Sequence, residues 1–263
     1  MTSIGKPFKS LESYNKAMTN SLDDKLFFVD KLPKDDYLFV DFGCADGALL
    51  EKLQQLACAS YIGYDISDEM LSLARVRTPN IEYTNNWLNI EKATLIAKEN
   101  KKKVVLILSS VLHEVFSYSS KKLIQTFWNN IKIGNFDYIV VRDMMPSDDI
   151  WRSTSKDLYE KIYLNADETQ LQEFEARWGT IKNNKNFVHF LLKYRYKTNW
   201  FRELNENYFP IYLKEFLKTM NLFNINYLER FRVPFLEKCW KEEFDIEIKD
   251  YTHIKAIFSR RLD

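Results

Sequence analysis

A short loop of small residues carries the chemistry that is easiest to recognise in this sequence. Residues Val40–Gly47 read V-D-F-G-C-A-D-G, and two of the chain's 6 glycines, Gly43 and Gly47, lie in this stretch. An apolar run precedes the loop and a helical pattern follows it, so the loop should join a strand to a helix. Small side chains at such a turn let a ligand approach the backbone, and we expect the amides at the helix start to remain free for that ligand. The pattern predicts a binding loop for a nucleotide-like cofactor.

The acids around this loop indicate which cofactor it binds. The glycines are four positions apart, which differs from the G-x-G-x-x-G spacing of dinucleotide-binding loops. Asp41 lies two residues before Gly43, where a carboxylate would repel a pyrophosphate but attract a cationic amino-acid tail. S-adenosylmethionine carries such a tail. A second apolar stretch ends at Asp65, 24 residues after Asp41, where nucleotide-binding folds place an acid that accepts hydrogen bonds from the ribose.

With this loop and these two acids, the chain resembles the class I S-adenosylmethionine-dependent methyltransferases, whose first motif runs acid-x-Gly-x-Gly-x-Gly. Ala45 replaces the middle glycine of that motif. The resemblance implies S-adenosylmethionine as the cofactor, Asp65 on its ribose, Ile66 against its adenine, and Asn86 as the polar contact to the adenine amine. The predicted cofactor-binding residues are Asp41, Gly43, Cys44, Ala45, Gly47, Asp65, Ile66, Met70, Asn86, Trp87 and Ser109.

A histidine and an acid follow the fourth predicted strand. Residues Val104–Leu108 form a continuous apolar run typical of a buried parallel strand, and His113 and Glu114 come shortly after it. Because ligands bind outside the carboxyl ends of parallel strands, we expect this pair to face the transferred methyl group. His113 and Glu114 are therefore the predicted catalytic residues, either one acting as a general base. Alternatively, His113 packs against the adenosyl group or the next helix, while Glu114 caps that helix. Arg142 and Asp143 end the fifth strand, where they either meet the acceptor or pair with each other.

The elements that position these residues alternate between strand and helix. We expect strands over residues 37–40, 61–65, 80–86, 104–108, 136–141, 225–233 and 252–259. Helical patterns lie between the first five strands, and a further helix is expected over 208–220. This order predicts a doubly wound α/β fold, with a seven-stranded, mostly parallel sheet and helices on both faces.

Two helical additions are expected outside this core. Leu22, Leu26 and Val29 share a helical face in an N-terminal lead that begins with a capping box at Ser21 and could close over the cofactor as a lid. The strand–helix alternation stops after Pro146 and gives way to polar, mostly helical patterns. We divide the chain into a helical lead (1–36), a cofactor-binding core (37–146), a helical insertion after the fifth strand (147–205) and the C-terminal part of the core (206–263).

The insertion contains a basic and aromatic segment, which we define as residues 176–202. It has no Asp or Glu, and seven cations alternate with seven aromatic side chains. Such a mixture suits phosphate backbones and unstacked bases, although the rings can equally form a core beneath a solvated basic face. We therefore expect RNA or a nucleotide as the acceptor, slightly ahead of a small metabolite.

Composition sets the remaining expectations. With 263 residues, 46% of them hydrophobic, and a net charge of +1, the chain has no overall field that favours nucleic acid or a membrane. Its 3 cysteines form no C-x-x-C pair, and no apolar stretch reaches membrane-spanning length, so we expect a cytoplasmic protein without a membrane partner. No metal site is predicted, because H-E-V-F-S lacks the second histidine of H-E-x-x-H.

The predicted function is methyl transfer from S-adenosylmethionine. The alternatives are a non-catalytic S-adenosylmethionine-binding module and, least favoured, a nicotinamide dehydrogenase.

Overall fold

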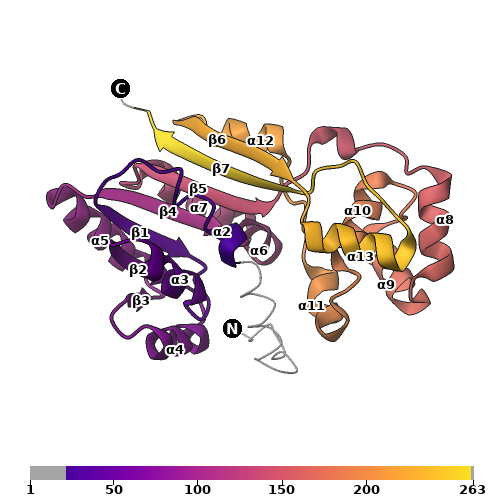
Figure 1. Cartoon of the computed structure of the whole chain (residues 1–263), viewed down its shortest axis with the longest axis horizontal. Helices are drawn as coiled ribbons and strands as arrows, with labels where there is room; N and C mark the ends of the chain where they lie inside the picture. The colour runs from indigo at the N-terminus through magenta and orange to yellow at the C-terminus, as the bar shows by residue number, and fades with distance from the viewer. Residues whose placement is uncertain (1–21, 262–263) are drawn as a thin grey trace.

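A seven-stranded sheet forms the centre of the protein in a computed structural model that describes residues 22–261 (Figure 1). The strand order is β3-β2-β1-β4-β5-β7-β6, and only β7 runs antiparallel to the other strands in this range. This arrangement confirms the predicted fold class. The capping box predicted at Ser21 lies outside the described residues. The strands are β1 (Tyr37–Phe42), β2 (Ser60–Tyr64), β3 (Glu82–Thr84), β4 (Lys103–Ser109), β5 (Tyr138–Met144), β6 (Phe223–Phe231) and β7 (His253–Arg260).

Helices cover both faces of the sheet. One face carries the short helix α2 (Leu22–Lys25), α3 (Ala48–Leu56) and α4 (Asp68–Arg77). The other face carries α5 (Trp87–Glu99), α6 (Leu112–Tyr118), α7 (Lys121–Ile133) and α12 (Leu213–Thr219). None of the helices in the described part of the chain is long and apolar enough to cross a membrane.

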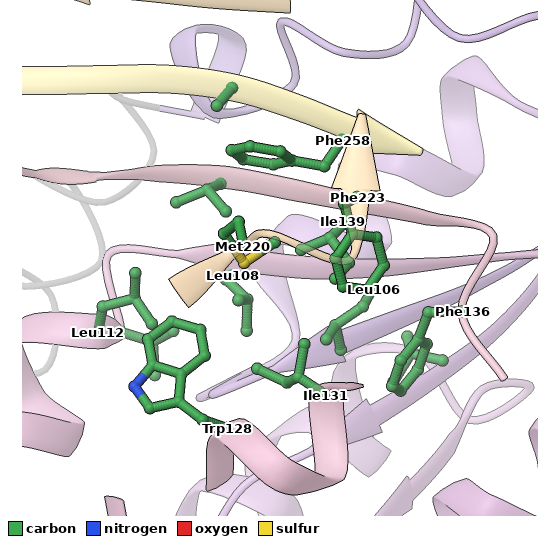
Figure 2. Close-up of a cluster of buried hydrophobic side chains, with 14 of the residues drawn as sticks. Leu106, Leu108, Leu112, Trp128, Ile131, Phe136, Ile139, Met220, Phe223 and Phe258 are labelled. Carbon is green, nitrogen blue, oxygen red and sulfur yellow. The ribbon is translucent and has the colours of Figure 1, made fainter. Parts of the chain in front are cut away.

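Strand β4 shows why the sheet has two hydrophobic faces. Leu106 and Leu108 enter the cluster beneath α5, α6, α7 and α12, whereas Val105 and Ile107 enter the cluster beneath α2, α3 and α4. All four side chains are fully buried. Successive side chains of a strand point to opposite faces, so a continuous apolar run is what a strand needs when helices cover both sides. Figure 2 shows the first of these clusters, in which Trp128 lies near the β4 leucines.

A third hydrophobic cluster lies outside the sheet, in the insertion (Figure 1, right). Its elements are η1 (Asp148–Ile150), α8 (Lys156–Asn165), α9 (Glu168–Trp178), α10 (Asn184–Lys193), η2 (Lys197–Asn199) and α11 (Trp200–Asn205). The predicted helical insertion is thus present. A helix that was not predicted, α13 (Pro234–Phe244), joins the same cluster through Leu236, Trp240 and Phe244. The fourth predicted part of the chain, 206–263, therefore supplies one wall of the insertion as well as two strands of the sheet.

Proline explains one boundary that differs from the prediction. The helix expected over 208–220 begins only at Leu213, after Pro210, because the residue before a proline disfavours helical backbone. The strand expected over 80–86 shortens to β3, because Ile81 takes part in a turn and Asn86 caps α5. In the N-terminal lead, regular helix ends at Lys25.

Candidate active site

The predicted site residues gather at the carboxyl ends of four neighbouring strands. Strands β1 and β4 lie side by side at the point where the strand order reverses, which is where open α/β sheets bind ligands. The loop Gly43–Gly47 follows β1, Asp65 follows β2, Asn86 follows β3, and Ser109 ends β4. In Figure 1 these strand ends face the insertion, and α2 lies between the two. The sheet therefore brings residues far apart in the sequence to one edge.

Both glycines of the loop are required by backbone conformation and by packing. Gly43 and Gly47 have φ values of 77° and 78°, in the left-handed region that favours glycine. A Cβ atom on Gly43 would lie 2.6 Å from Cγ2 of Val111, and one on Gly47 would lie 2.6 Å from the hydroxyl of Tyr83. Ala45, which replaces the middle glycine of the motif, also has a positive φ of 45°. The small residues thus allow the loop to fold tightly against its own protein.

The expectation of free amides at the start of the helix holds for Leu49 and Leu50, which make no backbone hydrogen bond within residues 22–261, but most amides of the loop itself are bonded. The amides of Gly43 and Cys44 both donate to the carbonyl of Tyr64, at 2.8 and 3.0 Å. The amide of Gly47 donates to the carbonyl of Cys44, and that of Ala48 donates to Oδ1 of Asp46. The turn closes onto the end of β2, so its amides are used to hold its shape. Ligand recognition here is left to side chains and to the amides in the first turn of α3.

Asp65 is placed to hold the loop and to accept a ligand. Its Oδ2 accepts the amide of Ala45 and its Oδ1 accepts the amide of Ser67, both at 2.9 Å. The side chain is only partly buried, and each carboxylate oxygen retains a further lone pair for a ribose hydroxyl. Beside it, Ile66 exposes 84% of its surface, and Met70 is partly buried. An exposed apolar side chain next to a carboxylate suits an adenine ring that follows its ribose.

We expect Asp65→Ala to weaken binding of S-adenosylhomocysteine by about 1.5–3 kcal/mol, because a hydrogen bond to a charged group is lost. Isothermal titration calorimetry measures this change, and thermal unfolding reports the contribution of the two backbone amides. Glu69→Ala, at an exposed position of the same segment, is the control and should bind normally. Unchanged affinity in the Asp65 variant would contradict its assignment to the ribose.

Asp41 lies deeper in the site, where the charge of Lys25 from the N-terminal lead acts on it. The Asp41 side chain is 2% exposed, and burial raises its pKa to about 7 although the charge of Lys25 opposes this shift. Lys25, at the end of α2, is 5% exposed, and burial lowers its pKa to about 8. Asp41 and Lys25 thus place one acidic and one basic group beside the glycine loop.

The remaining predicted cofactor residues differ in what their side chains do. Asn86 caps α5 by accepting the amide of Leu88 at 3.1 Å, and Trp87 packs edge-on against Phe42 and Tyr64. These contacts give both residues a structural role, and their contact with the cofactor stays a prediction. The hydroxyl of Ser109 is buried and has no hydrogen-bond partner within residues 22–261. Because a buried hydroxyl is costly unless it is paired, this atom fits a bound ligand.

His113 is held by an acid from the neighbouring strand. Its Nδ1 lies 2.8 Å from Oδ1 of Asp143, and Oδ2 of Asp143 accepts the amide of Leu112 at 2.7 Å. Burial alone would lower the pKa of His113, but the charge and hydrogen bond of Asp143 outweigh burial and raise it above its usual range. The same contacts hold the pKa of Asp143 low despite its complete burial. Asp143 thus pairs with His113, and not with Arg142, the alternative considered from the sequence.

Glu114 makes a different contact from His113. Nη2 of Arg202 donates to Oε1 of Glu114 at 2.8 Å, and Nε of the same arginine donates to Glu206 at 2.7 Å. Tyr118 also donates to Glu206, whose second carboxylate oxygen lies 3.9 Å from Nε2 of His113. Arg202 therefore joins α6, which carries the histidine, to the insertion. This contact favours a positioning role for Glu114.

The basic and aromatic segment contributes three of its seven rings to the folded core of the insertion, whereas Tyr196 and Phe201 are exposed. Phe187, Phe190 and Tyr194 are buried in its hydrophobic cluster. Lys193 is fully buried and donates to the carbonyls of Glu203 and Glu206. The three buried rings are unavailable for stacking on bases, which weakens the argument for an RNA acceptor.

The residues that sequence reasoning missed come from distant parts of the chain. Lys25, Arg202 and Glu206 were not assigned to the site, and Asp143 was given no defined role. Arg202 had a signal, since it closes the stretch that lacks acids, and Lys25 belongs to the N-terminal lead that was expected to close over the cofactor. A contact such as Arg202 to Glu114, 88 residues apart, leaves no periodic pattern in the sequence.

Comparison with known proteins agrees with this geometry. Residues 39–134 match a family model described as a methyltransferase domain. The structure resembles an S-adenosylmethionine-dependent methyltransferase from Mesorhizobium loti, with 15% identity and a TM-score of 0.50 over 91% of this chain and 100% of the other. It also resembles magnesium protoporphyrin IX methyltransferase from Synechocystis PCC 6803 with bound SAH, with 12% identity and a TM-score of 0.50 over 98% and 90% of the two chains. Among curated proteins, none matches the sequence.

The chain therefore has the class I fold of S-adenosylmethionine-dependent methyltransferases. Residues 39–134 are its methyltransferase domain. The matched domain makes the protein a methyltransferase that uses S-adenosylmethionine as its cofactor.

Proposed function

We propose that the protein methylates a small-molecule acceptor that approaches from the side of the insertion, with His113 as the general base. The single observation that carries this proposal is the buried pair of His113 and Asp143 at the carboxyl edge of the sheet. Asp143 accepts a proton-bearing Nδ1, so neutral His113 presents a lone pair at Nε2. Such a base can take the proton of a hydroxyl, carboxyl or thiol group as that group is methylated.

The two carboxylates of the site bind different parts of the cofactor in this proposal. When bound, S-adenosylmethionine supplies a methyl group on a positively charged sulfur. We assign Asp41 to the ammonium of the amino-acid end and Asp65 to the ribose, so that neither charge touches the sulfur. A carboxylate at the sulfur would stabilise the ground state more than the transition state, in which positive charge is lost. Alignment of the acceptor with the methyl group then supplies much of the acceleration.

The charges of the insertion favour a small acceptor over RNA. Arg195 pairs with Glu243 at 3.1 Å, and Arg202 and Lys193 are engaged inside the protein. The exposed Arg177, Lys182 and Lys197 each lie over an aromatic ring of the same chain. An RNA acceptor remains the second candidate, supported by these three cations. A cytoplasmic location stays part of the proposal.

Transfer of a labelled methyl group from S-adenosylmethionine into fractionated metabolite, protein and RNA pools tests the proposed function. We expect label in the metabolite pool, and transfer that changes little between low and physiological salt. Label in RNA that disappears steeply as salt rises would favour the second candidate, because phosphate contacts are salt-dependent. Cofactor binding without transfer to any pool would instead indicate a non-catalytic binding module.

The pKa of Asp41 predicts how cofactor affinity depends on pH. Because this pKa is raised to about 7, Asp41 is mostly protonated below that pH and must lose its proton to pair with an ammonium. We expect the affinity for S-adenosylhomocysteine to fall by up to about tenfold for each pH unit below 7. Calorimetry between pH 5 and 8 measures this slope. Methylthioadenosine, which lacks the amino-acid end, should give a flat profile, and a flat profile for both ligands would contradict the role of Asp41.

A further inference from the structure

The segment that follows α11 lies against the ring of His113. Glu206 is the C-cap of that helix, and its side chain is 3% exposed. Oε2 of Glu206 lies 3.9 Å from Nε2 of His113, and the ring of Tyr208 meets the imidazole edge-on, with ring centroids 5.6 Å apart. The insertion therefore places a carboxylate beside the ring nitrogen that Asp143 does not contact.

Hydrogen bonds hold this segment against α6. The hydroxyl of Ser117 donates to the carbonyl of His113 at 2.7 Å and accepts the amide of Asn207 at 2.8 Å. One side chain of α6 thus joins the backbone of the histidine to the backbone next to Glu206. The spacing between Nε2 of His113 and the Glu206 carboxylate is therefore fixed by backbone contacts as well as by side chains.

The two oxygens of the Glu206 carboxylate have different surroundings. Oε1 accepts Nε of Arg202 at 2.7 Å and the hydroxyl of Tyr118 at 3.1 Å, whereas Oε2 faces His113. At 3.9 Å the separation from Nε2 is too long for a hydrogen bond, so a neutral His113 keeps its lone pair there. A proton on Nε2 would instead place a positive charge beside a carboxylate that is already held in position.

The groups around His113 favour its charged form. The charged and titratable neighbours are Asp143 of β5, Glu114 of α6, Glu206 and Tyr208 of the segment after α11, and His253 of β7. Burial lowers the pKa of His253 to about 3 and raises that of Tyr208, so neither is charged at neutral pH. Lys25 and Arg202 are cations that act on the surrounding carboxylates. Asp143 and Glu206 each lie next to one nitrogen of the ring.

We infer that Glu206 is a positioning residue for methyl transfer, which holds His113 as the ring takes the acceptor's proton. In that step the acceptor atom bonds to the methyl carbon, the carbon–sulfur bond breaks with its electron pair going to sulfur, and the acceptor's proton passes to Nε2. The proton-bearing Nε2 then donates to Oε2 of Glu206, and a charge-assisted hydrogen bond stabilises the imidazolium. This role rests on the proposed function of His113, and it gives the insertion a part in the reaction itself.

The titration of His113 tests this role without an acceptor. NMR of ¹⁵N-labelled protein follows the imidazole nitrogens, and the chain has 3 histidines to assign. We expect Glu206→Gln to move the His113 midpoint to lower pH, because glutamine keeps the shape of the side chain and removes its charge. Glu206→Asp, which keeps the charge, should titrate close to the unmodified protein. Glu243→Gln removes the carboxylate of another arginine pair, with Arg195, and is the matched control in which the midpoint should not move.

Kinetics with the acceptor identified by label transfer gives a second measurement. The plateau of kcat at high pH should fall about 3- to 10-fold in Glu206→Gln, because a weaker base takes the acceptor's proton less readily. The affinity for S-adenosylhomocysteine should stay the same. An increase in kcat would mean that Glu206 competes with the acceptor for Nε2, and an unchanged titration would mean that Glu206 does not act on the ring; each result overturns the inference.

The outcomes separate this role from the proposed function. If His113→Asn leaves kcat unchanged, His113 is not the base and both assignments fail. If His113→Asn lowers kcat but Glu206→Gln changes neither the titration nor kcat, His113 is the base and Glu206 is not its partner. Should Glu206→Gln fail to fold, the unmodified protein is measured at a pH at which His113 is protonated. We then expect a downfield, slowly exchanging Nε2 proton, and a rapidly exchanging one would overturn the inference.

Discussion

Replacing Gly43 with valine should destabilise the protein by about 2–5 kcal/mol and abolish measurable binding of S-adenosylhomocysteine. A left-handed backbone costs a residue other than glycine about 1–2 kcal/mol, and forcing extra atoms into a packed site costs about 1–3 kcal/mol more. Both costs apply here, since Gly43 has a φ of 77° and its Cβ would lie 2.6 Å from Val111. The loop can relieve the clash only by moving away from Val111. Such a shift would also break the hydrogen bond from the Ala45 amide to Asp65 and disturb the proposed ribose contact.

Thermal unfolding and calorimetry together measure these two losses. Gly179→Ala is a suitable control, because Gly179 also has a positive φ, 90°, but lies in the insertion. We expect this control to lower stability while leaving cofactor affinity unchanged. A Gly43→Val protein that binds S-adenosylhomocysteine normally would show that the loop does not shape the cofactor site.

Replacing His113 with asparagine should lower kcat about 10²- to 10⁴-fold, which is the usual contribution of a general base. Cofactor affinity should change by no more than a few-fold, because the proposed cofactor contacts lie on other residues. The measurement uses the acceptor identified by label transfer, together with calorimetry for S-adenosylhomocysteine. Glu114→Gln should cause a smaller loss, since Arg202 holds the Glu114 carboxylate. A larger effect at Glu114 than at His113 would exchange their proposed roles.

The pH profile of kcat tests the same assignment through Asp143. The pKa of His113 is raised by Asp143, so activity should increase with pH through a value above the ordinary histidine range, as the imidazole loses its proton. In Asp143→Asn the carboxylate charge is gone, and the inflection should move to lower pH while maximal activity falls. A profile that is the same in both proteins would mean that His113 does not titrate in the reaction.

The glycine loop and the second acid could be predicted because their pattern is local. Gly43, Gly47 and Asp65 lie within a single strand–helix–strand unit, and the structure confirms the contact between loop and acid through the amide of Ala45. The bonding of the loop amides was not predicted, because the sequence did not reveal that the carbonyl of Tyr64 accepts two of them. The fold class could be predicted from the alternation of apolar runs and helical patterns. A sheet that is covered by helices on both faces requires this alternation.

Partners that meet only in the folded chain could not be predicted. Asp143, at the end of β5, meets His113 of α6 although the two residues lie 30 positions apart, and Arg202 meets Glu114 over 88 positions. Helix α13 was missed for a different reason, because its signals are present in the sequence. Pro234 lies in its first turn, and Leu236, Trp240 and Phe244 have helical spacing. The basic segment was ambiguous for a physical reason: rings that stack on bases and rings that fill a core have the same composition.

The position of α13 has a consequence for how the protein is made. Its apolar face, together with Ile246 and Ile248 just after it, completes a cluster whose other buried members, from Ile150 to Phe209, are synthesised earlier. Strand β6 comes between them in the sequence. On the ribosome, the earlier helices therefore emerge without the surface that covers them, and their hydrophobic residues stay accessible to chaperones until the last part of the chain has been translated.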